Sequence, residues 1–307
     1  MQRFQQNRHA LGSSVYLTIV LEDGEPVTPI FDMLWRHIDE FENRFSRFLE
    51  DSELSTFNAA AGTKQNISPE FRKLLIAAKG MAKKSNGLYN PCTLPALQRA
   101  GYKGSWPEPH KFNDTLVYED RSIVDWRDIH IGNTEAMIPG DAALDFGGIG
   151  KGYLLDELAQ VLDKHTINSY WLSLGGDILC NGYDANGDSW RVGIQDARSE
   201  NKTVGSIKNK GQRIAIATSG VTKRQGISGN GQWHHIIDPR TGKPAQTDSL
   251  TTTVCSKSAT IADVTAKCLI IVGSAATEQV LSPMNVTEAL LQRNDNTTIK
   301  IGTIWQP

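Results

Sequence analysis

The stretch ALDFGGIGKGYLLDEL, residues 143–158, places four glycines and a lysine between a carboxylate and an apolar pattern. Because glycine has no side chain, Gly147, Gly148 and Gly150 would let the backbone approach a ligand closely and adopt a positive φ. The apolar pattern predicts a helix, whose first N–H groups are unpaired and whose end is partly positive. With the charge of Lys151, this arrangement would suit an anion such as a phosphate.

The same stretch has a second interpretation, in which a glycine turn precedes a helix and Asp145 caps that helix. It is not a Walker A loop, because no Ser or Thr follows the lysine, and it is not a GxGxxG loop either. With a bound ligand, Asp145 and Asp156 could hold a ribose hydroxyl, a ring N–H or a metal. The residues alone leave both interpretations open.

Two later segments predict strands that end in small or polar residues. SLGGDIL, residues 173–179, ends in a glycine pair and Asp177, which indicates either a second loop close to a ligand or an ordinary β-turn. IATSG, residues 216–220, ends in small hydrogen-bonding residues that include Thr218. Both strand ends are candidates for the same site as the glycine loop.

The segment WHHIIDPRTGKP, residues 233–244, carries two adjacent histidines before a turn over residues 238–242. His234 and His235 would point to opposite faces of a strand, so one of them would face the preceding loops. A histidine there could act as a general acid or base, because its ordinary pKa lies near neutrality. The alternative is a buried structural histidine.

The segment TIADVTAKCLIIVG, residues 260–273, predicts an apolar helix that carries Asp263 and Lys267. Spaced four apart, the two charges share one helix face and could form a simple surface ion pair. Their neighbours are apolar, however, which indicates a partly buried pair, and buried charges often mark a functional site.

Helical spacing is clearest in residues 31–48, where aromatic and aliphatic residues recur every three or four positions. Such a wide stripe is typical of a helix packed on a core rather than of a cofactor site. Ser68 as a cap, Pro69 in the first turn and Gly87 as a stop predict a second helix at residues 69–84. Further helices are expected near residues 154–162, 260–272 and 277–282.

Alternating and β-branched segments predict strands at residues 13–20, 170–174, 190–195, 213–218, 234–237 and 250–255, and a closing strand at 298–305. Residues 101–140 are rich in Gly, Pro and Asp and contain only short β-like pieces. Helices and strands do not alternate regularly, so an α+β fold is favoured over a doubly wound sheet.

The chain of 307 residues is 39% hydrophobic and 21% charged, which is typical of a soluble globular protein. Its formal net charge of −2 gives no support for a nucleic-acid partner. The four cysteines show no CxxC spacing, so we expect buried thiols rather than a zinc site.

No segment approaches the roughly 18 apolar residues of a membrane-spanning helix. The first residues show neither an apolar export signal nor a cysteine for a lipid anchor. As written, the sequence therefore predicts a cytoplasmic protein. A chain from which an export signal had been removed would look the same, and its protein would be exported or membrane-anchored.

Taken in order, the motifs DFGGIGKG, SLGGDI, ATSG, HIIDPRTGKP and the Asp-bearing last long helix resemble the FAD:protein FMN transferases, or ApbE family. HALGSSVYLTIV, FSRFLEDSELSTFN and NPCTLPAL extend this resemblance more faintly, so that it covers residues from about 10 to 275. It implies a single flavin transferase domain over residues 1–307, which two closely packed subdomains could make up. The implied fold is α+β, with mixed helices and antiparallel sheets resembling paired T-folds.

The resemblance also implies an activity. Members of the family bind FAD and use Mg²⁺ to split its pyrophosphate. They transfer FMN through a phosphoester to a Thr or Ser of a target flavoprotein and release AMP, and some members hydrolyse FAD instead. The implied partners are thus FAD and an acceptor flavoprotein, with no nucleic acid and no transmembrane segment.

Site residues follow from the same resemblance. His235 is the implied base for the acceptor hydroxyl, and Lys151 and Asp263 are the other implied catalytic residues. The Gly148 carbonyl and the Asp263 carboxylate are the implied Mg²⁺ ligands. The residues implied to bind FAD are Asp145, Gly147, Gly148, Lys151, Asn58, Leu88, Tyr89, Asn90, Thr218 and Leu250.

This sequence departs from the family pattern at several positions. Lys267 stands where the family usually has a Thr that ligates Mg²⁺, and a protonated amine cannot ligate a metal. Asn90 replaces an Asp, Ser173 replaces an Asn, and Leu11 replaces a Met. Either the charge of Lys267 replaces the metal and pairs with Asp263, or Lys267 points aside and Mg²⁺ still binds.

Three functions are therefore weighed. The first, which we favour, is FMN transfer from FAD to a protein, because His235, Lys151, Asp145 and Asp263 are all present. The second is an FAD-binding protein with little or no catalysis. The presence of Lys267 at the position of a metal ligand favours this function. The third is a Mg²⁺-dependent FAD pyrophosphatase, in which water replaces the acceptor hydroxyl.

Overall fold

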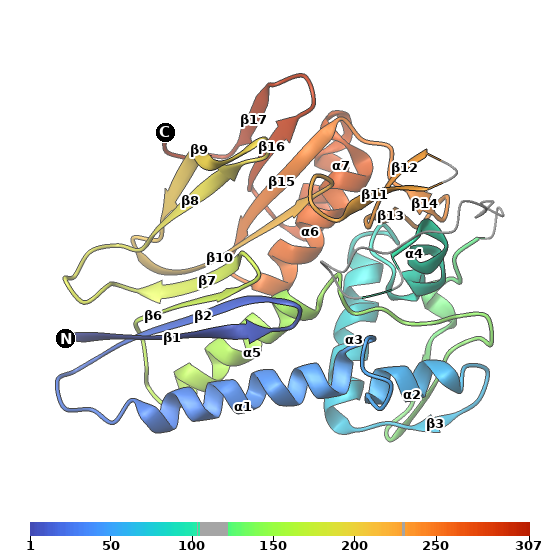
Figure 1. Cartoon of the computed structure of the whole chain (residues 1–307), viewed down its shortest axis with the longest axis horizontal. Coiled ribbons are helices and arrows are strands. Elements are labelled where there is room, and N and C mark those ends of the chain that lie inside the picture. The colour runs from blue at the N-terminus through green and yellow to red at the C-terminus, as the bar shows by residue number, and fades with distance from the viewer. Residues whose placement is uncertain (103, 105–121, 229–230) are drawn as a thin grey trace.

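The computed structural model describes residues 1–102, 104, 122–228 and 231–307, and its centre is an eight-stranded antiparallel sheet (Figure 1). The strands follow the order β1-β2-β6-β7-β10-β15-β16-β17. Their bounds are β1 (Gln2–Ala10), β2 (Ser13–Leu21), β6 (Tyr170–Leu174), β7 (Asp177–Gly182), β10 (Gly211–Gly220), β15 (Ser249–Ser256), β16 (Glu288–Arg293) and β17 (Thr298–Ile301). The predicted α+β fold with antiparallel sheets is confirmed.

Three helices pack against one face of this sheet: α1 (Thr28–Phe45), α5 (Gly150–Lys164) and α6 (Ala259–Val272). Alternate residues of β2 point toward them, so Val15, Leu17 and Ile19 are fully buried while Tyr16 is exposed. Leu34 of α1 and Leu158 of α5 belong to the same core. Buried apolar side chains on both layers stabilise this arrangement.

The hairpin β8 (Arg191–Asp196) and β9 (Ser199–Lys208) packs on the other sheet face. Val192, Ile194 and Ile207 of the hairpin share a core with Ile216 of β10 and Leu290 of β16. Both faces of the sheet are buried here, which explains why the sequences of β10 and β15 contain nearly continuous runs of apolar residues or Thr.

A second large core includes buried residues of α2 (Glu53–Ala59), α3 (Pro69–Lys84), α6 and α7 (Glu278–Met284), and the short helix α4 (Leu94–Ala100) lies near α3 (Figure 1). Phe57, Phe71 and Phe146 contact one another in it, with ring centroids 5.0 to 5.8 Å apart for neighbouring pairs. The other small elements are β3 (Gln65–Asn66), β4 (His130–Ile131), β5 (Glu135–Met137), β11 (Gln225–Ser228), β12 (Gly231–His234), β13 (Ile237–Asp238), β14 (Lys243–Pro244) and 3-10 turns at Pro91–Thr93, Trp126–Asp128 and Ser274–Ala276.

Several predicted elements are confirmed. Helix α3 has the predicted bounds, and the Ser68 hydroxyl caps it by accepting the Phe71 N–H at 3.1 Å. Strands β2, β6, β8, β10 and β15 and helices α5, α6 and α7 lie where strands and helices were expected. The aromatic stripe of residues 31–48 is mostly core, but α1 ends at Phe45, and Phe48 lies exposed beyond it.

Other predictions need correction. The expected strand at residues 234–237 is interrupted, because β12 ends at His234 and β13 begins at Ile237. The closing strand extends only over Thr298–Ile301, since Gly302 has a φ of +89° and the chain turns there. The predicted short β-like pieces of residues 101–140 lie partly outside the described residues.

The four cysteines are free and buried, as expected. Burial raises the pKa of Cys92, Cys180, Cys255 and Cys268 to about 12, so their thiols stay protonated at neutral pH. Among the described residues, no helix combines the length and hydropathy needed to cross a membrane.

Candidate active site

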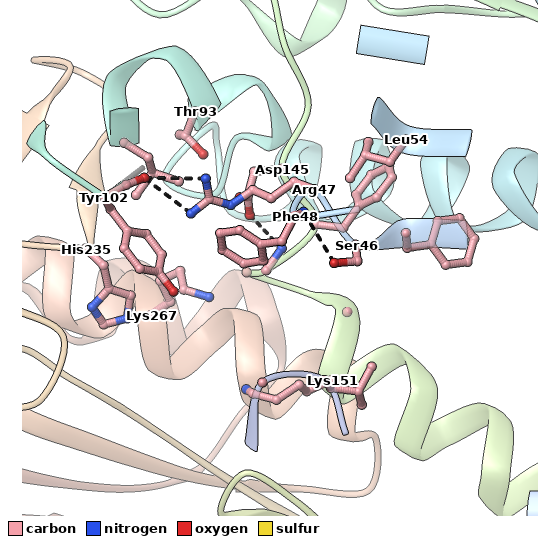
Figure 2. A pocket seen from close by; sticks show the side chains of 18 of the residues that line it. Ser46, Arg47, Phe48, Leu54, Thr93, Tyr102, Asp145, Lys151, His235 and Lys267 are labelled. Atoms are coloured by element: carbon pink, nitrogen blue, oxygen red, sulfur yellow. Dashed lines mark hydrogen bonds and ion pairs between the residues drawn. The ribbon is translucent and has the colours of Figure 1, made fainter. Parts of the chain in front are cut away.

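A cleft of about 500 Å³ opens between the sheet–helix layers and the second core. Its lining comes from segments far apart in the sequence, and Figure 2 shows Lys151 and Lys267 reaching into it from two helices. The predicted site residues that line it are Leu88, Tyr89, Asn90, Asp145, Gly147, Gly148, Lys151 and His235, together with Lys267. This volume is in the usual range of small-molecule sites.

The glycine loop borders the cleft, but its glycines are used differently from our expectation. Positive φ angles are found at other glycines of the described chain, not at Gly147, Gly148 or Gly150. Their missing side chains instead permit close contacts. A Cβ on Gly148 would lie 3.0 Å from the Lys267 Nζ, and one on Gly150 would lie 3.4 Å from the Phe41 ring.

Asp145 does not cap α5, so that interpretation is wrong. The N-cap position of α5 is Ile149, and no side chain caps it. Asp145 instead accepts the Gly147 N–H at 2.6 Å and forms an ion pair with Arg47 at 2.8 Å, both side chains being only 8% exposed. The pair fixes the start of the glycine loop against the segment that follows α1.

Lys151 is held at the cleft by an ion pair with Asp177. Asp177 follows Gly175 and Gly176, whose φ angles of +61° and +96° form the tight turn between β6 and β7. The glycine pair is therefore a hairpin turn, and it does not line the cleft. Burial alone would lower the pKa of Lys151, but the Asp177 and Asp263 carboxylates raise it above its ordinary value, so the ammonium is charged.

His235 lies in the bend between β12 and β13 and faces the cleft, while His234 does not line it. Its Nδ1 is 3.3 Å from the Arg224 carbonyl oxygen, and its ring meets the Tyr102 ring edge-on at 6.2 Å. Burial, with the charges of Arg224 and Lys267, lowers its pKa well below that of an ordinary histidine. The imidazole is therefore neutral at pH 7 and can accept a proton.

Asp263 and Lys267 form the partly buried pair expected from their spacing, with Oδ1 and Nζ 3.7 Å apart. Asp263 is 3% exposed and also accepts the Gly152 N–H at 3.3 Å. The Lys267 ammonium thus lies beside both residues that the family resemblance offers as Mg²⁺ ligands. A divalent ion about 4 Å from that ammonium would meet a repulsion of about 8 kcal/mol at an effective dielectric constant of 20.

The described residues contain no group of three or more His, Cys, Asp or Glu side chains that could hold a metal. Family-type Mg²⁺ binding would rest on Asp263 and the Gly148 carbonyl, with the ammonium close to both. In this arrangement the residues do not fit a magnesium ion.

Leu88, Tyr89 and Asn90 form one wall of the cleft. The Asn90 side chain is occupied locally, since it donates to the Val124 carbonyl and accepts the Cys92 N–H. The buried Tyr89 hydroxyl has no hydrogen-bond partner among the described residues, and burial with the nearby Asp145 and Asp263 raises its pKa well above its ordinary value. Tyr89 is thus a neutral phenol at the cleft floor.

Besides Asp177 and Asp263, four other candidates lie outside the lining of the cleft. The Asn58 amide bonds both the carbonyl and the N–H of Leu144 and so holds the backbone before the glycine loop. The Thr218 N–H donates to Asp177, and the Leu250 carbonyl accepts the Val221 N–H. Asp156 accepts the N–H groups of Ala259 and Thr260 at the start of α6 and the hydroxyl of Ser258, which is the N-cap of that helix.

Sequence reasoning missed several residues of the cleft. The Arg47 guanidinium lies over the Phe48 and Tyr102 rings, 4.3 and 4.6 Å from their centroids, and donates to the Tyr102 carbonyl at 3.4 Å (Figure 2). Arg224 also lines the cleft and adds positive charge beside His235. Arg47 lies within FSRFLEDSELSTFN, so that motif could have drawn attention to it.

Comparison with known families gives a consistent assignment. Residues 11–291 match the model of the ApbE family. A Treponema pallidum protein named FAD:protein FMN transferase is 30% identical over 240 residues, which are 73% of this chain and 66% of that relative. A Vibrio cholerae protein of the same name is 26% identical over 264 residues, 85% of this chain and 78% of the relative. The chain thus spans slightly less than two thirds of the first relative.

Solved structures share the fold. The flavin transferase ApbE from Vibrio cholerae superposes with a TM-score of 0.82 at 23% identity and covers 99% of this chain and 98% of its own. The apbe protein from Thermotoga maritima superposes with a TM-score of 0.85 at 24% identity, covering 98% and 97%. At these identities, the likeness establishes the architecture of the chain.

Proposed function

The chain belongs to the ApbE family, and from that premise we propose that it is an FAD:protein FMN transferase. It binds FAD in the cleft, attaches FMN through a phosphoester to a Thr or Ser of an acceptor flavoprotein, and releases AMP. The observation that carries this proposal is the gathering of a neutral histidine, a charged lysine and a glycine loop at the start of a helix in one cleft.

Residues at the beginning of α5 are suited to the diphosphate of FAD. Gly147, Gly148 and Gly150 line the cleft with backbone only, so a phosphate can come close to the chain there. The Gly147 and Gly150 N–H groups already donate to Asp145 and to the Phe146 carbonyl. The positive end of the helix and the Lys151 ammonium favour negative charge at that point. As the diphosphate bond breaks, the same groups stabilise the charge that builds on the departing AMP phosphate.

His235 is suited to act as the base in the transfer of FMN to the acceptor hydroxyl. The acceptor hydroxyl gives its proton to the neutral imidazole, and its oxygen forms a bond to the FMN phosphorus. The bond from that phosphorus to the bridging oxygen breaks, and AMP leaves with that oxygen. A base whose pKa is held below its ordinary value is unprotonated before each such step.

The walls of the cleft favour a large aromatic ligand. Leu88, Tyr89, Phe48 and Tyr102 give flat or apolar surface, and Ile237 lies in the same lining. Aromatic side chains stack on planar ring systems such as a flavin or an adenine. The apolar walls suit the ring systems of FAD, and the few charged groups at one end of the cleft suit its diphosphate.

The direct test is the intact mass of an acceptor protein after reaction. The probe is a flavin-free domain of a flavoprotein that carries FMN on a Thr, incubated with FAD and this protein. We expect a gain of one FMN less one water, and no gain when that Thr is changed to Ala. An unchanged acceptor mass, with FAD shown to be bound, would rule out the transferase.

A further inference from the structure

The Lys267 side chain is the cation nearest to the predicted metal ligands among the described residues. It projects from α6 one turn after Asp263, is 18% exposed, and lines the cleft. Its Nζ is 3.7 Å from Asp263 and 3.0 Å from the point where a Cβ of Gly148 would lie. The ammonium therefore occupies the space between the Asp263 carboxylate and the Gly148 backbone.

The lysine is also fixed there rather than free to turn away. Asp263 is buried, and Lys267 is its ion-pair partner among the described residues. Turning Lys267 aside would take the ion-pair partner away from a buried carboxylate, which is costly, and would leave the more distant Lys151 ammonium as a nearby positive charge. Gly148 leaves room for the amine, because an added Cβ would lie only 3.0 Å from both the Lys267 Nζ and the Tyr89 ring.

The charges around the cleft balance without a metal. Lys151 pairs with Asp177, and Lys267 pairs with Asp263, so each of these two ammonium groups of the lining is matched by a buried carboxylate outside the lining. Arg224 adds a further positive charge to the lining. A diphosphate that enters finds its negative charge opposed by groups of the chain itself, and a divalent ion would have to enter beside existing ammonium groups.

We propose that the Lys267 ammonium stands in place of a divalent cation, so that this chain binds and uses FAD without a metal. The inference rests on the proposed function, since it names the group that would meet the diphosphate in that reaction. It differs from an arrangement in which Lys267 points aside and Mg²⁺ binds to Asp263 and Gly148. The first arrangement predicts that a chelator leaves FAD binding unchanged, and the second predicts that it weakens FAD binding.

The test is a fluorescence titration of FAD binding to the whole protein, in EDTA and in millimolar Mg²⁺. We expect the same Kd in both conditions. Replacing Lys267 by Met, which removes the charge but keeps the length, should weaken FAD binding by at least about tenfold, because a charge-assisted contact is lost. Lys267→Thr should also bind FAD weakly in EDTA, and Mg²⁺ should restore its binding.

Lys257→Thr is the matched control, because Lys257 is exposed in the turn before α6 and lies outside the cleft lining. It should bind FAD like the unchanged protein in both conditions. Thermal melts of every variant show whether it is folded. A calorimetric titration of the unchanged protein with Mg²⁺ in the presence of FAD should give no binding heat.

The outcomes separate this inference from the proposed function. FAD binding by the unchanged protein that requires Mg²⁺ would overturn the inference and leave the transferase intact. FAD binding without metal but without FMN transfer would support metal-free binding through Lys267 and overturn the transferase. Unchanged FAD affinity in folded Lys267→Met would overturn the role of the lysine, and absence of FAD binding in every condition would overturn both proposals.

Discussion

At the scale of single residues, His235 is the group on which the chemistry depends. We expect His235→Asn to lower kcat/KM for FMN transfer by about 10²- to 10⁴-fold, the usual contribution of a general base. The affinity for FAD should change little, because asparagine can keep a polar contact near the Arg224 carbonyl. Steady-state kinetics and a fluorescence titration measure the two quantities.

The neighbouring His234 provides the control. Its Nε2 lies 2.9 Å from the Ala245 carbonyl oxygen, and the side chain does not line the cleft. His234→Asn should therefore keep most of the transfer rate. An equal loss of rate in both variants would show that the region, rather than the His235 imidazole, had been disturbed.

The pH dependence of kcat/KM reports the protonation of the free enzyme. Because the fold lowers the pKa of His235 below 6.5, the cation forms only at a pH lower than that of an ordinary histidine. Activity should be present above pH 6.5 and decline as the pH falls through the folded pKa. A decline already centred above pH 6.5, and retained in His235→Asn, would contradict this assignment.

The sequence predicted residues of the cleft unevenly, and the reason is physical. Lys151, His235 and the glycine loop stand in short local patterns whose chemistry can be read from neighbouring residues. Arg47 lies within a quoted motif, but its role, like that of Tyr102, arises only when the segment after α1 packs against Asp145 and the Tyr102 ring. Asn58 was proposed for ligand contact, but its amide instead holds the Leu144 backbone.

At the scale of elements, the crossing of α5 and α6 positions Lys151, Asp263 and Lys267 relative to one another. Gly152 lies at this crossing, where an added Cβ would lie 2.8 Å from the Ala259 carbonyl carbon and 2.9 Å from the Asp263 Cβ. Backbone atoms cannot yield easily, so Gly152→Ala should destabilise the fold by about 1–3 kcal/mol or more. Chemical denaturation measures this loss.

Gly80→Ala is the matched control for that prediction. Gly80 lies inside α3, and nothing stands within 4 Å of its added Cβ. Alanine is the better helix former, so this variant should gain up to about 1 kcal/mol. If Gly152→Ala were as stable as Gly80→Ala, the close approach of the two helices would be refuted.

The elements themselves were predicted where local signals are strong. Helix α3 has a cap, a first-turn proline and a terminal glycine, and its bounds were correct. Strand β1 was missed because its residues are mostly polar and exposed, and only pairing with β2 makes it a strand. The interruption between β12 and β13 was also missed, since residues 233–237, WHHII, contain no glycine or proline that would indicate a break.

At the scale of the whole molecule, the site exists only because distant segments meet. One cleft is lined by residues from the end of α1, the segment after α3, the start of α5, the bend after β12 and the middle of α6. An anion-binding loop alone would suit many ligands. Combined with aromatic walls and a neutral base, it favours a reaction on the diphosphate of a flavin dinucleotide.

The most direct measurement counts AMP released against FMN attached to the acceptor in the same reaction, with and without the acceptor domain. We predict one AMP for each FMN attached, and little AMP without acceptor. Equal AMP in both reactions, with free FMN, would identify a pyrophosphatase, and intact FAD throughout would identify a binding protein. Either result would contradict transfer of FMN to a protein hydroxyl as the function of this chain.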